Sequence, residues 1–173
     1  MDDFLDQVEA AASDSRFYYL ALSGALVIPD ICSALESNNG QASGLRYKGW
    51  FDTHVAPLHV NVWTHQPFLN GESCYRFRCS FLHQGSTRQA SRGYTRILFI
   101  EPGVQSPVHA HMNILNDALN IDVRDFCLEM VGSARRWLAG VIGTEPYETN
   151  INAFVRRYPS GLSPYIAGVS VIS

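Results

Sequence analysis

The sequence predicts an α+β protein that is predominantly helical: a four-helix N-terminal bundle, then a small antiparallel β element with two further helices. Apolar residues recur at helical spacing in four stretches of residues 1–85. The pattern changes at residues 93–101 and 108–115, which are bounded by turn formers and predicted as strands. At 173 residues the chain fits one domain, residues 1–173, with a helical-bundle portion (1–85) and an α+β portion (93–173).

The first two helices are predicted from apolar spacing and capping residues. Residues 2–12 form a short amphipathic pattern. A second, mostly apolar helix is expected to begin at a Ser15 cap and run to about Glu36. Pro29 is expected to kink or restart that helix, because proline removes a backbone hydrogen bond and crowds the preceding turn.

The third and fourth helices flank a region without clear periodicity. Residues 43–54 are predicted as a helix, and residues 56–69, with two prolines, as a loop with at most a short extended piece. Asn70 is expected to cap the fourth helix, with Glu72 favourably placed near the positive end of its dipole. Gly85 is expected to end it.

The C-terminal half is predicted to mix strands and helices. Residues 101–107 suit a hairpin-like connection between the two predicted strands. Asp122 is expected to cap a long helix over about 123–142, and a further helix is expected over about 146–158. Residues 164–172 form a final apolar segment predicted as a strand.

Composition excludes several broad classes of protein. With 46% apolar residues, 17% charged residues and a net charge of −3, the chain is neither disordered nor a general polyanion binder. The apolar run 17–28 is too short to span a bilayer, and the acidic start Met1-Asp2-Asp3 is unlike a secretory signal, so a cytoplasmic protein is expected. Four cysteines without a Cys-x-x-Cys pair indicate neither a disulfide framework nor a zinc ribbon.

The charges are unevenly distributed along the chain. Residues 73–100 contain no acidic residue. The acids gather instead at the N-terminus and between Asp117 and Glu148. We therefore expect a local cationic patch on an otherwise acidic protein, formed by the five arginines of the acid-free segment: Arg76, Arg78, Arg88, Arg92 and Arg96.

The end of the fourth predicted helix carries the main candidate site. Arg78 is followed by four residues and then His83, and Arg76 is followed by six and then the same histidine. This arrangement, late in a helix and just before Gly85, resembles the Arg-x4-6-His signature of the HEPN superfamily. Many active members have a polar residue, commonly Asn, directly after the arginine, where this chain has Cys79.

The HEPN resemblance implies a helical-bundle homodimer, and many members are metal-independent ribonucleases. His83 would act as general base towards a ribose 2′-hydroxyl, because imidazole exchanges a proton near neutral pH. Arg78, supported by Arg76, would hold the scissile phosphate. Ser80 and Gln84 would orient the RNA. This scheme requires no metal ion or other cofactor.

Helix geometry suggests that the site is composite. At 100° per residue, Arg78 and His83 lie about 140° apart, so neither Arg78 nor Arg76 is expected to touch His83 closely within one helix. Two copies related by a twofold axis would bring both pairs to one cleft. Asp30, an acid within the most apolar helix, either pairs with Arg76, Arg78 or His83 or stabilises a helix restart after Pro29.

Two other classes of function remain open. The helical bundle is compatible with a non-catalytic dimerisation or regulatory module whose basic segment contacts a protein partner. His109 and His111 would share one face of a strand, so a metal-dependent or small-molecule enzyme is the third possibility. No neighbouring Asp, Glu or Cys completes a metal-ligand set in the sequence around them.

Overall fold

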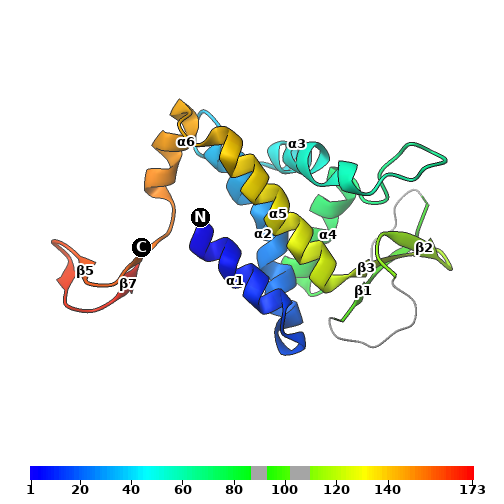
Figure 1. The fold of residues 1–173 in the computed structure, drawn as a ribbon, viewed down its shortest axis with the longest axis horizontal. Coiled ribbons are helices and arrows are strands. Elements are labelled where there is room, and N and C mark those ends of the chain that lie inside the picture. The colour runs from blue at the N-terminus through cyan, green and yellow to red at the C-terminus, as the bar shows by residue number, and fades with distance from the viewer. Residues whose placement is uncertain (87–92, 102–109) are drawn as a thin grey trace.

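The computed structural model describes residues 1–86, 93–101 and 110–173 of a predominantly helical α+β protein (Figure 1). Helix α2 is at its centre and packs against five other helices. The helices are α1 (Asp2–Ala12), α2 (Tyr18–Leu35), α3 (Gly44–His54), α4 (Gly71–Gln84), α5 (Val123–Val141) and α6 (Glu145–Asn150). Short 3₁₀ turns occur at Ser15–Phe17, Ala56–Leu58 and Ile151–Ala153.

Helix α2 is central because its sequence is apolar on most sides. Its buried residues face α1, α3, α4 and α5, and they include Leu22, Leu26 and Ile28. A kink or a restart was predicted at Pro29, and the unbroken helix from Tyr18 to Leu35 excludes the restart. Burial against several helices outweighs the cost of the hydrogen bond that proline removes.

The length of α2 changes the argument about membranes. Residues Ser15–Leu35 are long and apolar enough to cross a bilayer by length and composition, with a mean hydropathy of 1.5. The apolar run 17–28 was judged too short to span a bilayer. That judgement no longer holds, because the helix does not stop before Pro29. Half of the segment is buried inside the protein, and its packing against other helices accounts for its apolar character.

Most predicted helix boundaries are confirmed. Ser43 caps α3 by accepting a hydrogen bond from the Arg46 amide, and Asp122 caps α5 in the same way from the Asp125 amide. At the start of the second helical segment, Asp14 rather than Ser15 is the capping residue. The helix predicted over 146–158 is much shorter, because α6 ends at Asn150.

The three-stranded sheet differs from the predicted antiparallel hairpin. Its strands are β1 (Arg96–Ile100), β2 (Asn113–Leu115) and β3 (Ala118–Asp122), in the order β1-β3-β2. β3, which the sequence pattern did not reveal, pairs parallel to β1 and antiparallel to β2. Asn116 and Asp117, both with positive φ, form the tight turn between β2 and β3. The hairpin therefore joins β2 to β3, not β1 to β2.

The last twenty residues, 154–173, form a separate feature that we call the C-terminal arm. The single predicted strand over 164–172 is replaced by two small antiparallel pairs. Figure 1 shows the arm, in orange and red, extending away from the helices. Its strands are β4 (Arg157–Tyr158) paired with β7 (Val171–Ile172), and β5 (Gly161–Leu162) paired with β6 (Ile166–Ala167).

The close approach of α3 and α4 requires a glycine at position 71. A Cβ there would overlap the Lys48 carbonyl oxygen. The Gly71 amide also donates a 2.6 Å hydrogen bond to Asp52 Oδ1, which ties the first turn of α4 to α3. This contact fixes the position of the helix that carries the main candidate residues.

We expect Gly71→Ala to lower the free energy of unfolding by about 1–3 kcal/mol, because the backbones must separate to admit the methyl group. Gly49→Ala is the matched control, since a Cβ at Gly49, inside α3, meets nothing within 4 Å. That variant should be neutral or gain up to about 1 kcal/mol from helix propensity. Urea unfolding followed by circular dichroism would measure both, and equal effects would contradict the packing argument.

Candidate functional site

Helix α4 forms as the sequence predicts and presents two different faces. The Asn70 side chain accepts a hydrogen bond from the Ser73 amide at the start of the helix, and Gly85 ends it in the left-handed conformation with φ of 60°. Phe77 and Phe81 are buried, with ring centroids 5.4 Å apart. The candidate residues project from the remainder of the helix surface.

Arg78 connects α4 to the central helix. Its Nε donates to Asp30 Oδ2 at 3.0 Å, and its Nη2 lies 2.8 Å from the same oxygen. The two side chains are mostly buried, with 21% of Arg78 and 15% of Asp30 exposed. Of the roles considered for Asp30, pairing with a residue of the fourth helix is therefore the one that the structure shows.

The environment raises the pKa of both members of this pair. Burial raises the pKa of Asp30 above its ordinary value, and the Arg78 charge and hydrogen bond only partly oppose this shift. Burial acts to lower the pKa of Arg78, but the charge of Asp30 and hydrogen bonds to Cys79 and Asp30 outweigh it, and the pKa is raised. The carboxylate is thus costly to bury, and Arg78 is the cation that compensates for it.

Arg78 also contacts His83, which contradicts the expectation that the two would not touch within one helix. Arg78 Nη1 lies 3.2 Å from His83 Nε2. The helical projection places the two residues on different sides, but the long arginine side chain reaches across the intervening turn. A guanidinium only donates, so His83 Nε2 accepts here and the ring proton lies on Nδ1.

The supporting residues of the motif lie on the same helix. Arg76, His83 and Gln84 are exposed, and Ser80 is half-buried. The Ser80 carbonyl oxygen accepts a hydrogen bond from the Ser86 amide after the helix end. The structure thus brings Asp30, Arg78 and His83 into one chain of contacts, with Arg76 more exposed than Arg78.

The arginine-rich segment is only partly within the described residues. Arg88 and Arg92 lie outside them, and so does His109. Arg96 begins β1 and is exposed. Of the five arginines expected to form a cationic patch, Arg76, Arg78 and Arg96 lie within the described residues, and Arg78 is paired with Asp30.

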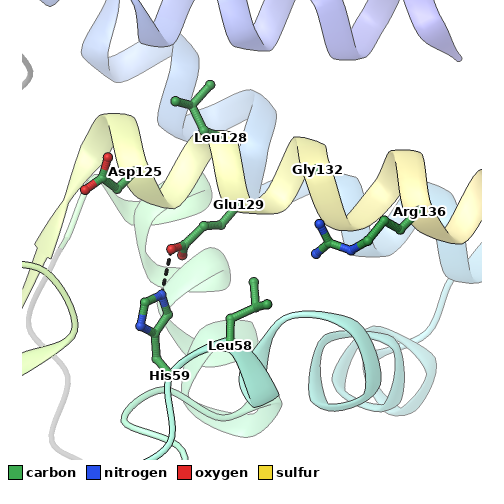
Figure 2. Close-up of a pocket in the computed structure, with 7 residues that line it drawn as sticks. All are labelled: Leu58, His59, Asp125, Leu128, Glu129, Gly132 and Arg136. Atoms are coloured by element: carbon green, nitrogen blue, oxygen red, sulfur yellow. Dashed lines mark hydrogen bonds and ion pairs between the residues drawn. The ribbon is translucent and has the colours of Figure 1, made fainter.

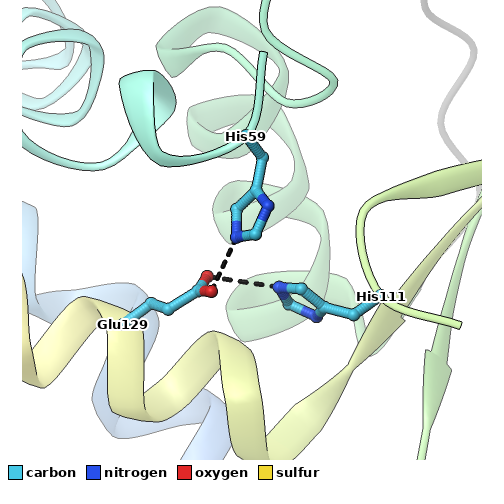
Figure 3. Close-up of side chains that lie close together, drawn as sticks. All are labelled: His59, His111 and Glu129. Carbon is cyan, nitrogen blue, oxygen red and sulfur yellow. Dashed lines mark hydrogen bonds and ion pairs between the residues drawn. The ribbon is translucent and has the colours of Figure 1, made fainter. Parts of the chain in front are cut away.

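A second cluster of polar side chains, His59, His111 and Glu129, joins three distant parts of the chain (Figure 3). His59 Nε2 lies 2.6 Å from Glu129 Oε1, and His111 Nε2 lies 3.2 Å from Glu129 Oε2. The two rings are in edge-to-face contact, with centroids 4.8 Å apart. One potential ligand atom from each residue lies within 4.8 Å of the others, a compact set that invites comparison with a metal centre.

The hydrogen bonds within this cluster favour protons over a metal ion. The Asp122 backbone amide donates to His111 Nδ1 at 3.1 Å. A neutral imidazole whose Nδ1 accepts a hydrogen bond carries its proton on Nε2, the atom that faces Glu129. His111 in this tautomer has no lone pair on Nε2 for a metal, so we describe the cluster as a hydrogen-bond network centred on the Glu129 carboxylate.

Glu129 lines an open pocket of about 430 Å³ between α5 and the 3₁₀ turn Ala56–Leu58 (Figure 2). Figure 2 shows His59 and Glu129 on one side of this hollow and Arg136 further along α5. Arg136 Nη2 donates to Ser133 Oγ at 2.9 Å. The pocket walls are completed by Leu58, Asp125, Leu128 and Gly132.

The sequence pattern assigns neither His59 nor Glu129 to a site. His59 falls in the predicted loop 56–69, and Glu129 is 70 residues further along the chain. One signal was present: Glu129 directly precedes Met130, which is fully buried on the apolar stripe of α5. A carboxylate at the edge of a buried helix face needs a hydrogen-bond donor, and such a donor can come from another part of the chain.

Comparison with known proteins does not assign the chain to a family: no family model, no curated protein and no solved structure matches it.

The pairing of Asp30 with Arg78 predicts a strongly non-additive pair of mutations. Arg78→Met should lower the free energy of unfolding by about 1–3 kcal/mol, a range reduced from that of fully buried pairs because both side chains retain some exposure. In an Asp30→Asn background the same change should cost much less, since no buried carboxylate is left unpaired. A double-mutant cycle by urea unfolding tests this. Equal costs in both backgrounds would contradict the ion pair.

The network around Glu129 predicts acid sensitivity. Burial acts to raise the pKa of Glu129, but the hydrogen bonds from His111 and His59 outweigh burial and lower it. A lowered carboxyl pKa contributes stability above the unfolded-state pKa, and that stability is lost as pH falls through the folded-state pKa.

Glu129→Gln should therefore cost about 1–2 kcal/mol at pH 7, and the difference from wild type should shrink as pH falls below about 4. Thermal unfolding monitored by circular dichroism at several pH values would measure this. Asp117→Asn, which changes a carboxylate outside the network, serves as the control. A pH-independent difference would argue against ionised Glu129 as the centre of the network.

Proposed function

We propose that this protein is a HEPN-like, cytoplasmic, RNA-binding homodimer that acts as a metal-independent endoribonuclease. The observation that carries the proposal is the contact chain from Asp30 through Arg78 to His83 at the end of α4. It places the exposed imidazole of His83 next to the guanidinium of Arg78. Cleavage of an RNA phosphodiester uses such a base and such a cation. Four α-helices lie within residues 1–85, the number that the resemblance implies.

The proposed chemistry assigns His83 and Arg78 complementary roles. His83 Nε2 carries the lone pair that would accept the ribose 2′-hydroxyl proton. Arg78 Nη1 donates to that lone pair in the free protein. An RNA phosphate at Arg78 would compete for this donor and release the base as the substrate binds.

Arg76, Ser80 and Gln84 are assigned to RNA binding. Arg76 is exposed on α4 seven residues before His83, which places it nearly on the same stripe two turns away. It therefore supports Arg78 by attracting the RNA backbone. Residues 73–100 contain no acid, and the acid that contacts Arg78, Asp30, is compensated by that arginine.

The runner-up is a non-catalytic dimerisation or regulatory module in which the same end of α4 contacts a partner. Cys79 favours this alternative, since it replaces the polar residue common in active HEPN proteins. Hydrogen bonds connect it to Tyr75 and Arg78, so it belongs to the packing that holds Arg78. Its presence is compatible with a basic segment that binds without cleaving.

Purified protein should cleave single-stranded RNA in the presence of EDTA, and His83→Asn should reduce the rate at least about 100-fold. His65→Asn is the matched control, because His65 is also exposed but lies in the loop before α4. Gel analysis of fluorescent RNA measures cleavage, and an unchanged circular dichroism spectrum shows that the variants fold. RNA binding without cleavage would favour the non-catalytic alternative, and absence of both would reject the proposal.

A further inference from the structure

Arg136 is a cation beside the α5 pocket to which the fold supplies no acidic partner. Its neighbour Arg135 forms ion pairs with Asp6 and Glu9. Among the residues that the structure describes, none forms an ion pair with Arg136, whose Nη2 donates to the Ser133 hydroxyl. A guanidinium has further N–H donors, so Arg136 can bind an anionic group that enters the pocket.

Gly132 lies between Glu129 and Arg136 on the pocket face of α5, although packing does not require a glycine there. Apart from its immediate neighbours in the helix, a Cβ at Gly132 would meet only Arg136 Nη1, at 3.4 Å. A glycine inside a helix is less favourable than an alanine. Its effect here is to leave space between the guanidinium and Glu129, and Figure 2 shows Arg136 extending back along α5 towards that space.

The other end of this space is acidic. The Glu129 carboxylate accepts one hydrogen bond at each oxygen, from His59 and from His111. Each oxygen has a second lone pair, so Glu129 can also accept from a bound ligand. Asp125 lines the same end of the pocket. A second anionic group would therefore be repelled there, and a cationic group attracted.

Leu58 adds an apolar contact between the two charged ends. It is 44% exposed, and Figure 2 shows it between His59 and Arg136, facing α5. The pocket volume of about 430 Å³ falls within the range of about 300–1,000 Å³ that small-molecule sites occupy. A cation, an anion and an apolar wall thus surround one space of the size of a small ligand.

We propose that this pocket binds a small zwitterion of the α-amino acid class with an aliphatic side chain. The ligand carboxylate accepts hydrogen bonds from Arg136, and the ligand ammonium group donates to Glu129. The aliphatic side chain packs on Leu58. The pocket does not include the end of α4, so the inference does not depend on RNA cleavage.

Isothermal titration calorimetry of the full chain with L-leucine tests the ligand class. We expect a Kd on the order of 10–100 µM for this small ligand. Isocaproate lacks the ammonium group of leucine and isoamylamine lacks its carboxylate. Each should bind at least about tenfold more weakly, because one charge-assisted contact is lost. No binding at about 10 mM leucine overturns the proposal, and so does either analogue binding as tightly as leucine.

Two variants with matched controls test the residues. Arg136→Gln should weaken leucine binding at least about tenfold. Arg124→Gln should not, because Arg124 is also exposed on α5 but does not line the pocket. Gly132→Ala should weaken binding at least about fivefold by filling space beside the guanidinium. Gly140→Ala, in the same helix with nothing within 4 Å of its Cβ, should leave binding unchanged.

Circular dichroism of the four variants checks that each remains folded. Leucine binding that is unaffected by either Arg136→Gln or Gly132→Ala overturns the proposal, as does equal weakening by a variant and its control.

Discussion

The position of helix α4 follows from a carboxylate placed in the middle of the central helix. Asp30 sits where α2 is packed on several sides, and burial raises its pKa by making the charged form costly. Arg78 compensates through two contacts to one carboxylate oxygen. Because the same guanidinium touches His83, the requirement of the core for a cation also sets the orientation of the candidate base.

A comparable constraint acts on α5. Glu129 of α5 gathers His59 from the loop after α3 and His111 from the segment before β2. The Asp122 amide fixes the tautomer of His111, and Asp122 also caps α5. One polar network therefore holds together the start of α5, the end of β3 and the loop carrying His59. In this tautomer His111 Nε2 carries a proton and has no lone pair for a metal.

The sequence predicts those elements whose signals are local. Helix α4 is bounded as expected because Asn70 and Gly85 act within one turn of its ends. Pro29 is a local signal too, but tertiary burial of α2 overrides it. Neither β3 nor the turn at Asn116 and Asp117 was predicted, because β3 is short and ends at Asp122, the residue that caps α5.

Sites that depend on distant residues were predictable only in part. The pairing of Asp30 with α4 was among the possibilities, because a buried acid needs a cation, but the choice of Arg78 required the helix packing. The engagement of Arg78 has a consequence for the proposed function. Because Arg78 donors are engaged by Asp30 and His83, the proposed binding of a phosphate would need a further cation. In the proposed homodimer, a second copy would add the exposed Arg76 of its own α4, so assembly and RNA binding would reinforce one another.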